Sequence, residues 1–175
     1  MRETHHSQIA KAPNELVVRG DYLAIQIGRI VLHSTLRPSR YSDDLQQVTL
    51  IETTYSNLWG HRIPTDCNRP LLIDSDGFQH SGYSTDEDAC VIESTHLPEG
   101  TRVPGVAAVI EGQARSRGWI AFPELPDPVV PHRLIFRTYI YAPGATSGTV
   151  KHSETLELVF DLSVFKRILN DAPNA

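Results

Sequence analysis

The regular alternation of apolar and polar side chains near the end of the chain is the feature that most restricts its fold. Residues 133–141 read RLIFRTYIY and residues 154–162 read ETLELVFDL. Because successive side chains of a β-strand point to opposite faces of a sheet, each segment predicts a strand with one buried face. We predict that the two strands pair, so that outward arginines lie near outward acids, a contact worth roughly 0.2–1 kcal/mol per pair. These outward charged residues are Arg133, Arg137, Glu157 and Asp161.

A second restriction comes from a change of phase within residues 21–33, DYLAIQIGRIVLH. Its apolar side chains occupy odd positions up to Ile27 and even positions from Ile30 onward. A strand that keeps one face buried across such a change needs an extra residue, and Gly28 is suited to this β-bulge. Residues 46–59, rich in Thr, Val, Ile and Tyr, predict another long strand.

The last apolar segment, LSVFKRILNDA, has a different spacing. Val164, Phe165, Ile168 and Leu169 recur at helical intervals. This spacing predicts one short amphipathic helix, capped at its beginning by Asp161 or Ser163, that covers an edge or end of a sheet.

The chain as a whole is expected to contain seven to nine short strands, proline-rich connections and this one helix. No strand alternates with a long helix, which excludes a parallel α/β sheet. We predict an all-β fold: an antiparallel, immunoglobulin-like β-sandwich with one short C-terminal helix. Residues 1–14 are expected to be a flexible tail, residues 15–171 a single domain, and residues 172–175 a second tail. The predicted core is Leu23, Ile25, Ile27, Leu134, Phe136, Leu156, Leu158 and Phe160.

Charge and hydrophobicity restrict the partners. The chain of 175 residues carries a formal net charge of −5, so its summed field repels nucleic acid phosphates and anionic lipid. No segment approaches the ~20 apolar residues of a membrane span, and no apolar leader begins the chain. We therefore expect no nucleic acid partner, no membrane insertion and a cytoplasmic protein with reduced cysteines, or an extracellular one if a leader has been removed. Whether Cys67 and Cys90 are close in space stays open.

Asp74-Ser75-Asp76-Gly77 has two readings, a calcium-binding loop and a tight turn. An EF-hand loop needs oxygen ligands at alternate positions, glycine sixth and glutamate twelfth. Here glycine is fourth, and Phe78 stands where the third oxygen is needed. A hairpin turn explains Asp74 as a cap of the backbone and Gly77 as a residue with positive φ. Whether the acidic residues Asp74, Asp76, Asp86, Glu87 and Asp88 converge on a cation stays open.

Other catalytic or binding motifs are not recognisable. The eight histidines and two cysteines lack the paired spacing of zinc sites, and neither cysteine nor any serine has the local pattern of a nucleophile. Arg115 and Arg117 precede Trp119 and could stack on a base, but the negative net charge favours solvent-facing arginines of a hairpin. We accordingly assign no catalytic, cofactor-binding or metal-binding residue, and no cofactor.

An ordered series of short motifs resembles a known family. LLIDSDGFQHSGY, LPEGTRVPG, GWIAFPELP and LELVFDL follow one another along the chain. The series resembles the immunoglobulin-like domain family of unknown function found in prokaryotic lipoproteins and surface proteins, which is related in fold to small secreted mycobacterial immunoprotective proteins. The resemblance covers roughly residues 22–162. The matching residues are Asp74, Gly77, Phe78, Gly100, Gly118, Phe122 and Pro123.

This resemblance implies a sandwich and transfers no catalytic residue. The chain departs from the family pattern in having no signal peptide or lipobox cysteine and in its predicted terminal helix. The expected function is a non-enzymatic binding or protein-interaction module with a protein partner; a homo-oligomer stays open. The alternative is a metal-dependent or carboxylate-based hydrolase with a site formed by loops, and fold alone does not choose between the two.

Overall fold

The two strands with the clearest alternation lie side by side in the computed structural model of the protein. β13 (Pro131–Tyr141) and β14 (His152–Asp161) pair antiparallel, with Arg133 opposite Asp161 and Arg137 opposite Glu157. The Nε atom of Arg137 donates to Glu157 Oε2 at 2.6 Å. The predicted pairing and its cross-strand charges are therefore confirmed.

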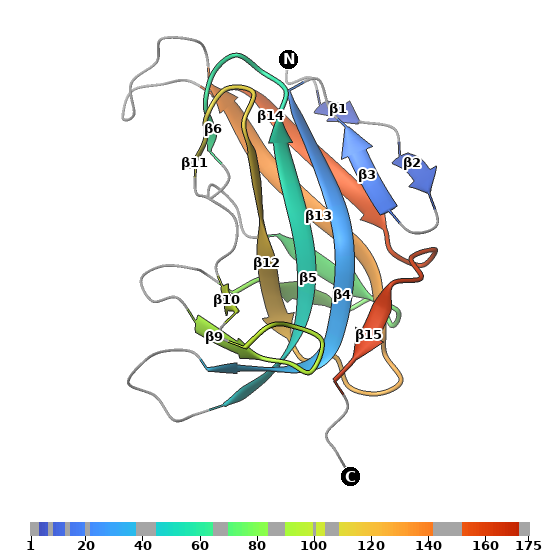
Figure 1. The fold of residues 1–175 in the computed structure, drawn as a ribbon. Helices are drawn as coiled ribbons and strands as arrows, with labels where there is room; N and C mark the ends of the chain where they lie inside the picture. Colours follow the sequence, from blue (N-terminus) through green and yellow to red (C-terminus); the bar gives the residue numbers. More distant parts are fainter. Residues whose placement is uncertain are drawn as a thin grey trace.

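The structure describes residues 4–6, 9–12, 15–19, 22–37, 45–64, 70–83, 90–99, 101–103, 109–141 and 152–171. Within these ranges every regular element is a β-strand. The strands form two sheets packed face to face and a small third pair (Figure 1). The smaller of the two sheets has the order β1-β14-β13-β7-β8. Its other strands are β1 (Thr4–His6), β7 (Leu71–Asp74) and β8 (Gln79–Ser81).

The larger sheet is organised around β4 (Leu23–Arg37). One edge of β4 pairs with β5 (Gln46–Asn57), which pairs in turn with β12 (Arg115–Pro123). The other edge of β4 is covered by three short strands in succession: β3, then β15, then β9. The remaining strands are β2 (Ile9–Ala12), β3 (Glu15–Arg19), β9 (Cys90–Glu93), β10 (Arg102–Val103) and β15 (Ile168–Asn170); β6 (Ile63–Pro64) and β11 (Val109–Ile110) form the third pair.

The predicted bulge lies in β4 at Gly28. The register against β5 shifts between Ile27 and Ile30, so one extra residue enters β4 there. Ile30 then continues the face that points into the sandwich, whereas Val31 points to the outer face. The phase change in the sequence is thus the signature of a bulge, as expected.

The main core lies between the two sheets and contains all but one of the predicted core residues. Leu23, Ile25, Ile27, Leu134, Phe136, Leu158 and Phe160 are all buried there; the side chain of Leu156 lies outside the described residues. The rings of Tyr55 and Phe160 meet the ring of Phe136 edge to face, with centroids 5.7 Å and 5.6 Å away. A second, smaller apolar cluster around Leu50 and Trp119 lies on the outer face of the larger sheet, where β9 and the turn after it cover it.

The predicted C-terminal helix is wrong. After a turn at residues 163–164 the chain runs as β15, which pairs in parallel with β4 from Ile30 to Leu32. The free edge of β4 between β3 and β9 offers backbone hydrogen bonds, and Ile30 N donates to Arg167 O at 3.1 Å. This pairing outweighs the helical spacing, and Val164, expected on the buried helix face, is exposed. Asp161 still caps the turn, because its Oδ1 accepts from Ser163 N at 3.0 Å.

Two short strands lie within the range expected to be an N-terminal tail. β1 pairs in parallel with β14, and β2 pairs with β3. The division into one domain of residues 15–171 with two tails stays a prediction.

Candidate functional site

The Asp74–Gly77 segment is a hairpin turn between β7 and β8. Gly77 has φ +89°, and its amide donates to Asp74 O at 3.1 Å. The buried Asp74 carboxylate accepts from the amides of Asp76 and Phe78 at 3.0 Å and 2.9 Å through Oδ1, and Oδ2 lies 2.7 Å from His80 Nε2. The predicted turn and positive φ are confirmed.

The electrostatics of this turn agree with a structural role. Burial tends to raise the pKa of Asp74, but the hydrogen bonds from His80, Phe78 and Asp76 outweigh it and lower this pKa. Asp76 is exposed. Residues 86–88, the other part of the open acidic cluster, lie outside the described residues, as does Cys67. Within the described ranges no three His, Cys, Asp or Glu side chains gather as metal ligands would.

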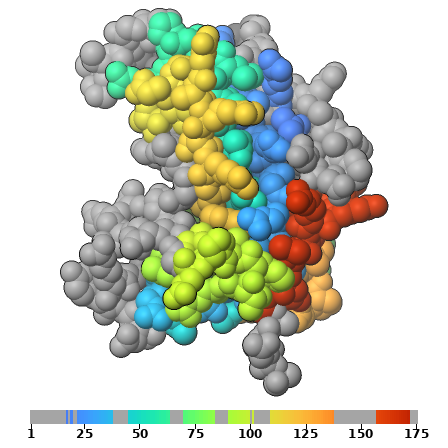
Figure 2. Space-filling view, viewed as in Figure 1, coloured from blue at the N-terminus to red at the C-terminus, as the bar shows by residue number. Residues whose placement is uncertain are grey.

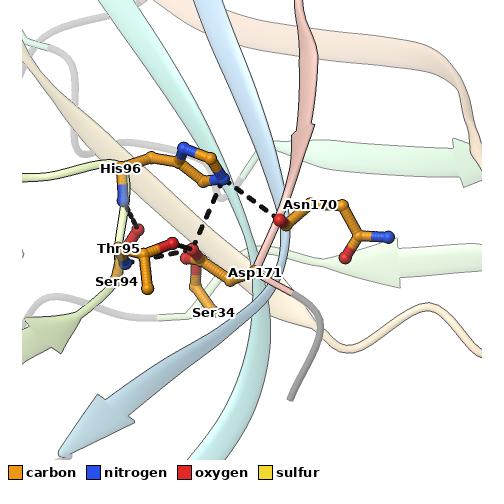
Figure 3. A network of polar contacts seen from close by, with 6 residues as sticks. All are labelled: Ser34, Ser94, Thr95, His96, Asn170 and Asp171. Carbon is orange, nitrogen blue, oxygen red and sulfur yellow. Dashed lines mark hydrogen bonds and ion pairs between the residues drawn. The ribbon is translucent and has the colours of Figure 1, made fainter. Parts of the chain in front are cut away.

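A second polar network fixes the C-terminal strand (Figure 3). The Asp171 carboxylate accepts from Ser34 Oγ at 2.8 Å and from the amide and hydroxyl of Thr95 at 3.0 Å and 2.6 Å. His96 Nε2 donates to Asn170 O at 3.0 Å. The residues come from β4, from the turn after β9 and from the end of β15, so the network ties three parts of the larger sheet together.

His33 joins β4 to the segment between β12 and β13. Its Nδ1 lies 2.9 Å from Glu124 Oε1 and its Nε2 lies 3.2 Å from Asp127 Oδ1. The hydrogen bond to Glu124 outweighs the effect of burial, and together with Asp127 it raises the pKa of His33. Both ring nitrogens lie beside carboxylate oxygens, so His33 is suited to holding β4 against this segment rather than to proton transfer.

Five charged side chains line a hollow on the outer face of the larger sheet. The hollow has a volume of about 520 Å³. Its lining comes from β4, β5, β12 and the segment before β15, whose atoms are coloured blue, teal, gold and red in Figure 2. The lining residues are Gln26, Gly28, Arg29, Glu52, Thr54, Arg115, Arg117 and Arg167.

The strand register brings these residues together. Gln26 of β4 lies opposite Thr54 of β5, and Thr54 lies opposite Arg117 of β12. Side chains two residues apart in β12 share a face, so Arg115 and Arg117 both point to the hollow. Arg167 comes from the segment that leads into β15.

Glu52 is the anionic centre of the hollow. Its side chain is 6% exposed, and it accepts from Arg29 Nε at 2.8 Å and from Arg117 Nε at 2.9 Å. Arg117 Nη2 also donates to the same carboxylate. Burial tends to raise the pKa of Glu52, but the hydrogen bonds and charges of the two arginines outweigh it and lower this pKa. Glu52 is therefore an ionised group with both oxygens engaged.

Gly28 makes this arrangement sterically feasible. A Cβ atom at residue 28 would lie 2.8 Å from Glu52 Oε2 and 3.1 Å from Glu52 Cδ. The carboxylate thus rests against the backbone of the bulge, in the space that a side chain would fill. The bulge predicted from the sequence therefore keeps the apolar face of β4 directed into the sandwich and also makes room for the Glu52 carboxylate.

Arg29 is held on two sides. Its guanidinium lies over the Trp119 ring, 5.2 Å from the ring centroid, and its Nε bonds Glu52. Such a cation–π contact favours a fixed orientation of the guanidinium. Trp119 is 8% exposed, so its ring is largely covered.

No site residue was predicted from the sequence, and of this group only Gly28, as the bulge, and Arg115 and Arg117 were singled out. The two arginines lie in β12 rather than in a hairpin. One signal pointed to the site: Glu52 is a lone carboxylate in the strand VTLIETTY, among residues that are buried on both faces. A charge at such a position requires partners.

The comparisons with known proteins give similarities to solved structures only. No protein-family model matches the chain, and no curated protein matches its sequence. A secreted protein of Mycobacterium tuberculosis, MPT63, is 13% identical with a TM-score of 0.44, over 92% of this chain and 98% of its own. An uncharacterized beta-sandwich protein of Clostridium difficile 630 is 12% identical with a TM-score of 0.36, over 92% and 97%.

The third structure is a candidate lipoprotein, ycdA, of Bacillus subtilis. It is 16% identical with a TM-score of 0.41 over 86% of this chain, and this chain spans 39% of its length. These neighbours are of the kinds that the sequence resemblance names. The cytoplasmic location stays a prediction. Among the described residues, none forms a helix of the length and apolarity that a membrane crossing requires.

Proposed function

We propose that this protein is a non-enzymatic binding module whose binding site is the hollow on the outer face of the larger sheet. The observation that carries the proposal is the gathering of four arginines from three separate parts of the chain around one buried carboxylate. Concave sites of about 300–1,000 Å³ are typical of small-molecule binding, and the hollow, at about 520 Å³, is within this range.

The chemistry of the lining favours binding over catalysis. Arginine keeps its proton at all ordinary pH values and donates in a fixed planar geometry. Glu52 has a lowered pKa and accepts hydrogen bonds at both oxygens, so it is a poor general base. These groups can hold and orient a ligand, whereas none of them is poised to move a proton.

A thermal-shift screen with acidic, basic and neutral small molecules tests the proposal. Ligands that raise the melting temperature of the wild type are tested again on Thr54→Trp, which fills the hollow, and on Gln79→Trp, which adds the same ring to an exposed site on β8. We expect the shift to disappear in Thr54→Trp and to persist in Gln79→Trp. A screen without any Thr54-dependent ligand would contradict the proposal.

A further inference from the structure

We infer that the hollow binds a small organic polyanion, a molecule with two or more carboxylate or phosphate groups. The inference rests on the proposed function, because it names the ligand class of the same site. It follows from the charge, the unused donors and the size of the hollow.

The charge of the hollow is opposite to the charge of the chain. Four arginines and one glutamate line it, which leaves three positive charges in excess. The whole chain carries a formal net charge of −5. Positive charge concentrated in a concave site raises the local concentration of anions even on an acidic protein. An excess of three charges suits a ligand with at least two negative groups.

Glu52 uses only part of the available hydrogen-bond donors. It accepts from Arg29 and Arg117. Arg115 donates from Nε to Ser56 Oγ at 3.0 Å, and among the described residues nothing else engages its guanidinium, which leaves its terminal nitrogens for a ligand. Within the described part of the chain, no side chain is paired with the guanidinium of Arg167. Guanidinium groups bind carboxylate and phosphate oxygens through two parallel hydrogen bonds.

The size and the polar floor of the hollow favour an organic ligand over a single inorganic ion. A volume of about 520 Å³ exceeds the space that one phosphate or sulfate ion fills. Gln26 and Thr54 line it beside the arginines and add an amide and a hydroxyl. These groups can both donate and accept, as recognition of hydroxyl groups between two anionic ends requires.

Isothermal titration calorimetry at constant ionic strength tests the inference with citrate as the carboxylate probe and fructose 1,6-bisphosphate as the phosphate probe. We expect at least one of them to bind the wild type at a single saturable site. In the double variant Arg115→Gln, Arg167→Gln the affinity should fall about tenfold or more, because each arginine supplies a charge-assisted hydrogen bond. The matched control is the double variant Arg37→Gln, Arg133→Gln, which removes the same charge elsewhere and should bind like the wild type.

The outcomes separate this inference from the proposed function. Binding by one probe and not by the other identifies the anionic group and supports the inference. Absence of saturable binding by both probes, or equal weakening in both double variants, would overturn it. If neutral or basic compounds then show Thr54-dependent binding, the hollow remains a binding site and only the ligand class is wrong; if no compound does, the proposed function fails as well.

Discussion

Glutamine in place of Glu52 removes one negative charge from the hollow and keeps the shape of the side chain. Removing one partner of a fully buried ion pair costs about 3–5 kcal/mol. Glu52 is 6% exposed, but the side chains of Arg29 and Arg117 are 30% and 67% exposed, so water can solvate them after the change. We therefore expect Glu52→Gln to lower the free energy of unfolding by about 2 kcal/mol.

Urea titration at neutral pH measures this loss. With a slope of about 2 kcal/mol per molar urea, the midpoint should fall by about 1 M. The matched control is Glu93→Gln, in which an arginine-paired glutamate of the same sheet loses its charge. Its partner Arg37 lies at 2.7 Å, and the two side chains are 44% and 46% exposed. Exposed pairs contribute about 0–1 kcal/mol, so this variant should change little. Equal losses in the two variants would refute the reasoning.

The pH dependence of stability provides a second measurement on Glu52→Gln. The folded pKa of Glu52 lies below its ordinary value of 4.5, so the folded state binds fewer protons than the unfolded state near this pH. The stability from the ionised carboxylate is present above pH 4.5 and is lost as the pH falls through the folded pKa. The difference in urea midpoint between wild type and Glu52→Gln should narrow from about pH 7 to about pH 3. A constant or growing difference would mean that the charge is not its source.

Four further substitutions test the fold. Gly77→Ala should destabilise by about 1–2 kcal/mol, because residue 77 has φ +89°, while Asp76→Asn should change the melting temperature little; equal effects would contradict the turn geometry. Phe136→Ala should cost about 3–5 kcal/mol in urea titration, and a loss within the noise would show that Phe136 is not core. His33→Gln tests whether the pKa of His33 is raised above 6.5 in the folded state. With a raised pKa the folded state binds more protons than the unfolded state. The stability that His33 contributes is then fully present below pH 6.5 and is lost as the pH rises through the folded pKa. Melting temperatures of wild type and variant should therefore converge at alkaline pH, and a gap that grows with pH would be the wrong sign.

Local patterns in the sequence predicted the parts of the fold that depend on local geometry. Gly28 marked the bulge because a phase change requires an extra residue, and Asp74 with Gly77 marked the turn because each fits one position of it. The cross-strand pair Arg137–Glu157 followed from alternation in two neighbouring strands. These features depend only on the two-residue period of a strand, on the residue preferences of turns and on the pairing of strands that are neighbours in the sequence.

Features that depend on distant partners were missed. Ile168 and Leu169 have helical spacing, but the edge of β4 that they pair with lies far away in the sequence and its availability is not visible there. The hollow was missed for the same reason: Arg29, Glu52 and Arg117 meet only through the register of three strands. Glu52 was the one indication of the hollow, because a charged side chain in a strand that is buried on both faces requires partners.

Nuclear magnetic resonance of the arginine side chains tests the central claim most directly, because each Nε–Hε group reports its own surroundings. Citrate and the phosphate probe are added in separate titrations to the isotope-labelled wild type at constant ionic strength, with each signal assigned by an Arg→Lys variant. With at least one of the two probes we predict saturable shifts for arginines of the hollow, Arg115 and Arg117 among them, and unchanged signals for Arg37 and Arg133, which lie elsewhere. Unchanged signals in the hollow with both probes, or equal shifts for all arginines, would contradict the claim.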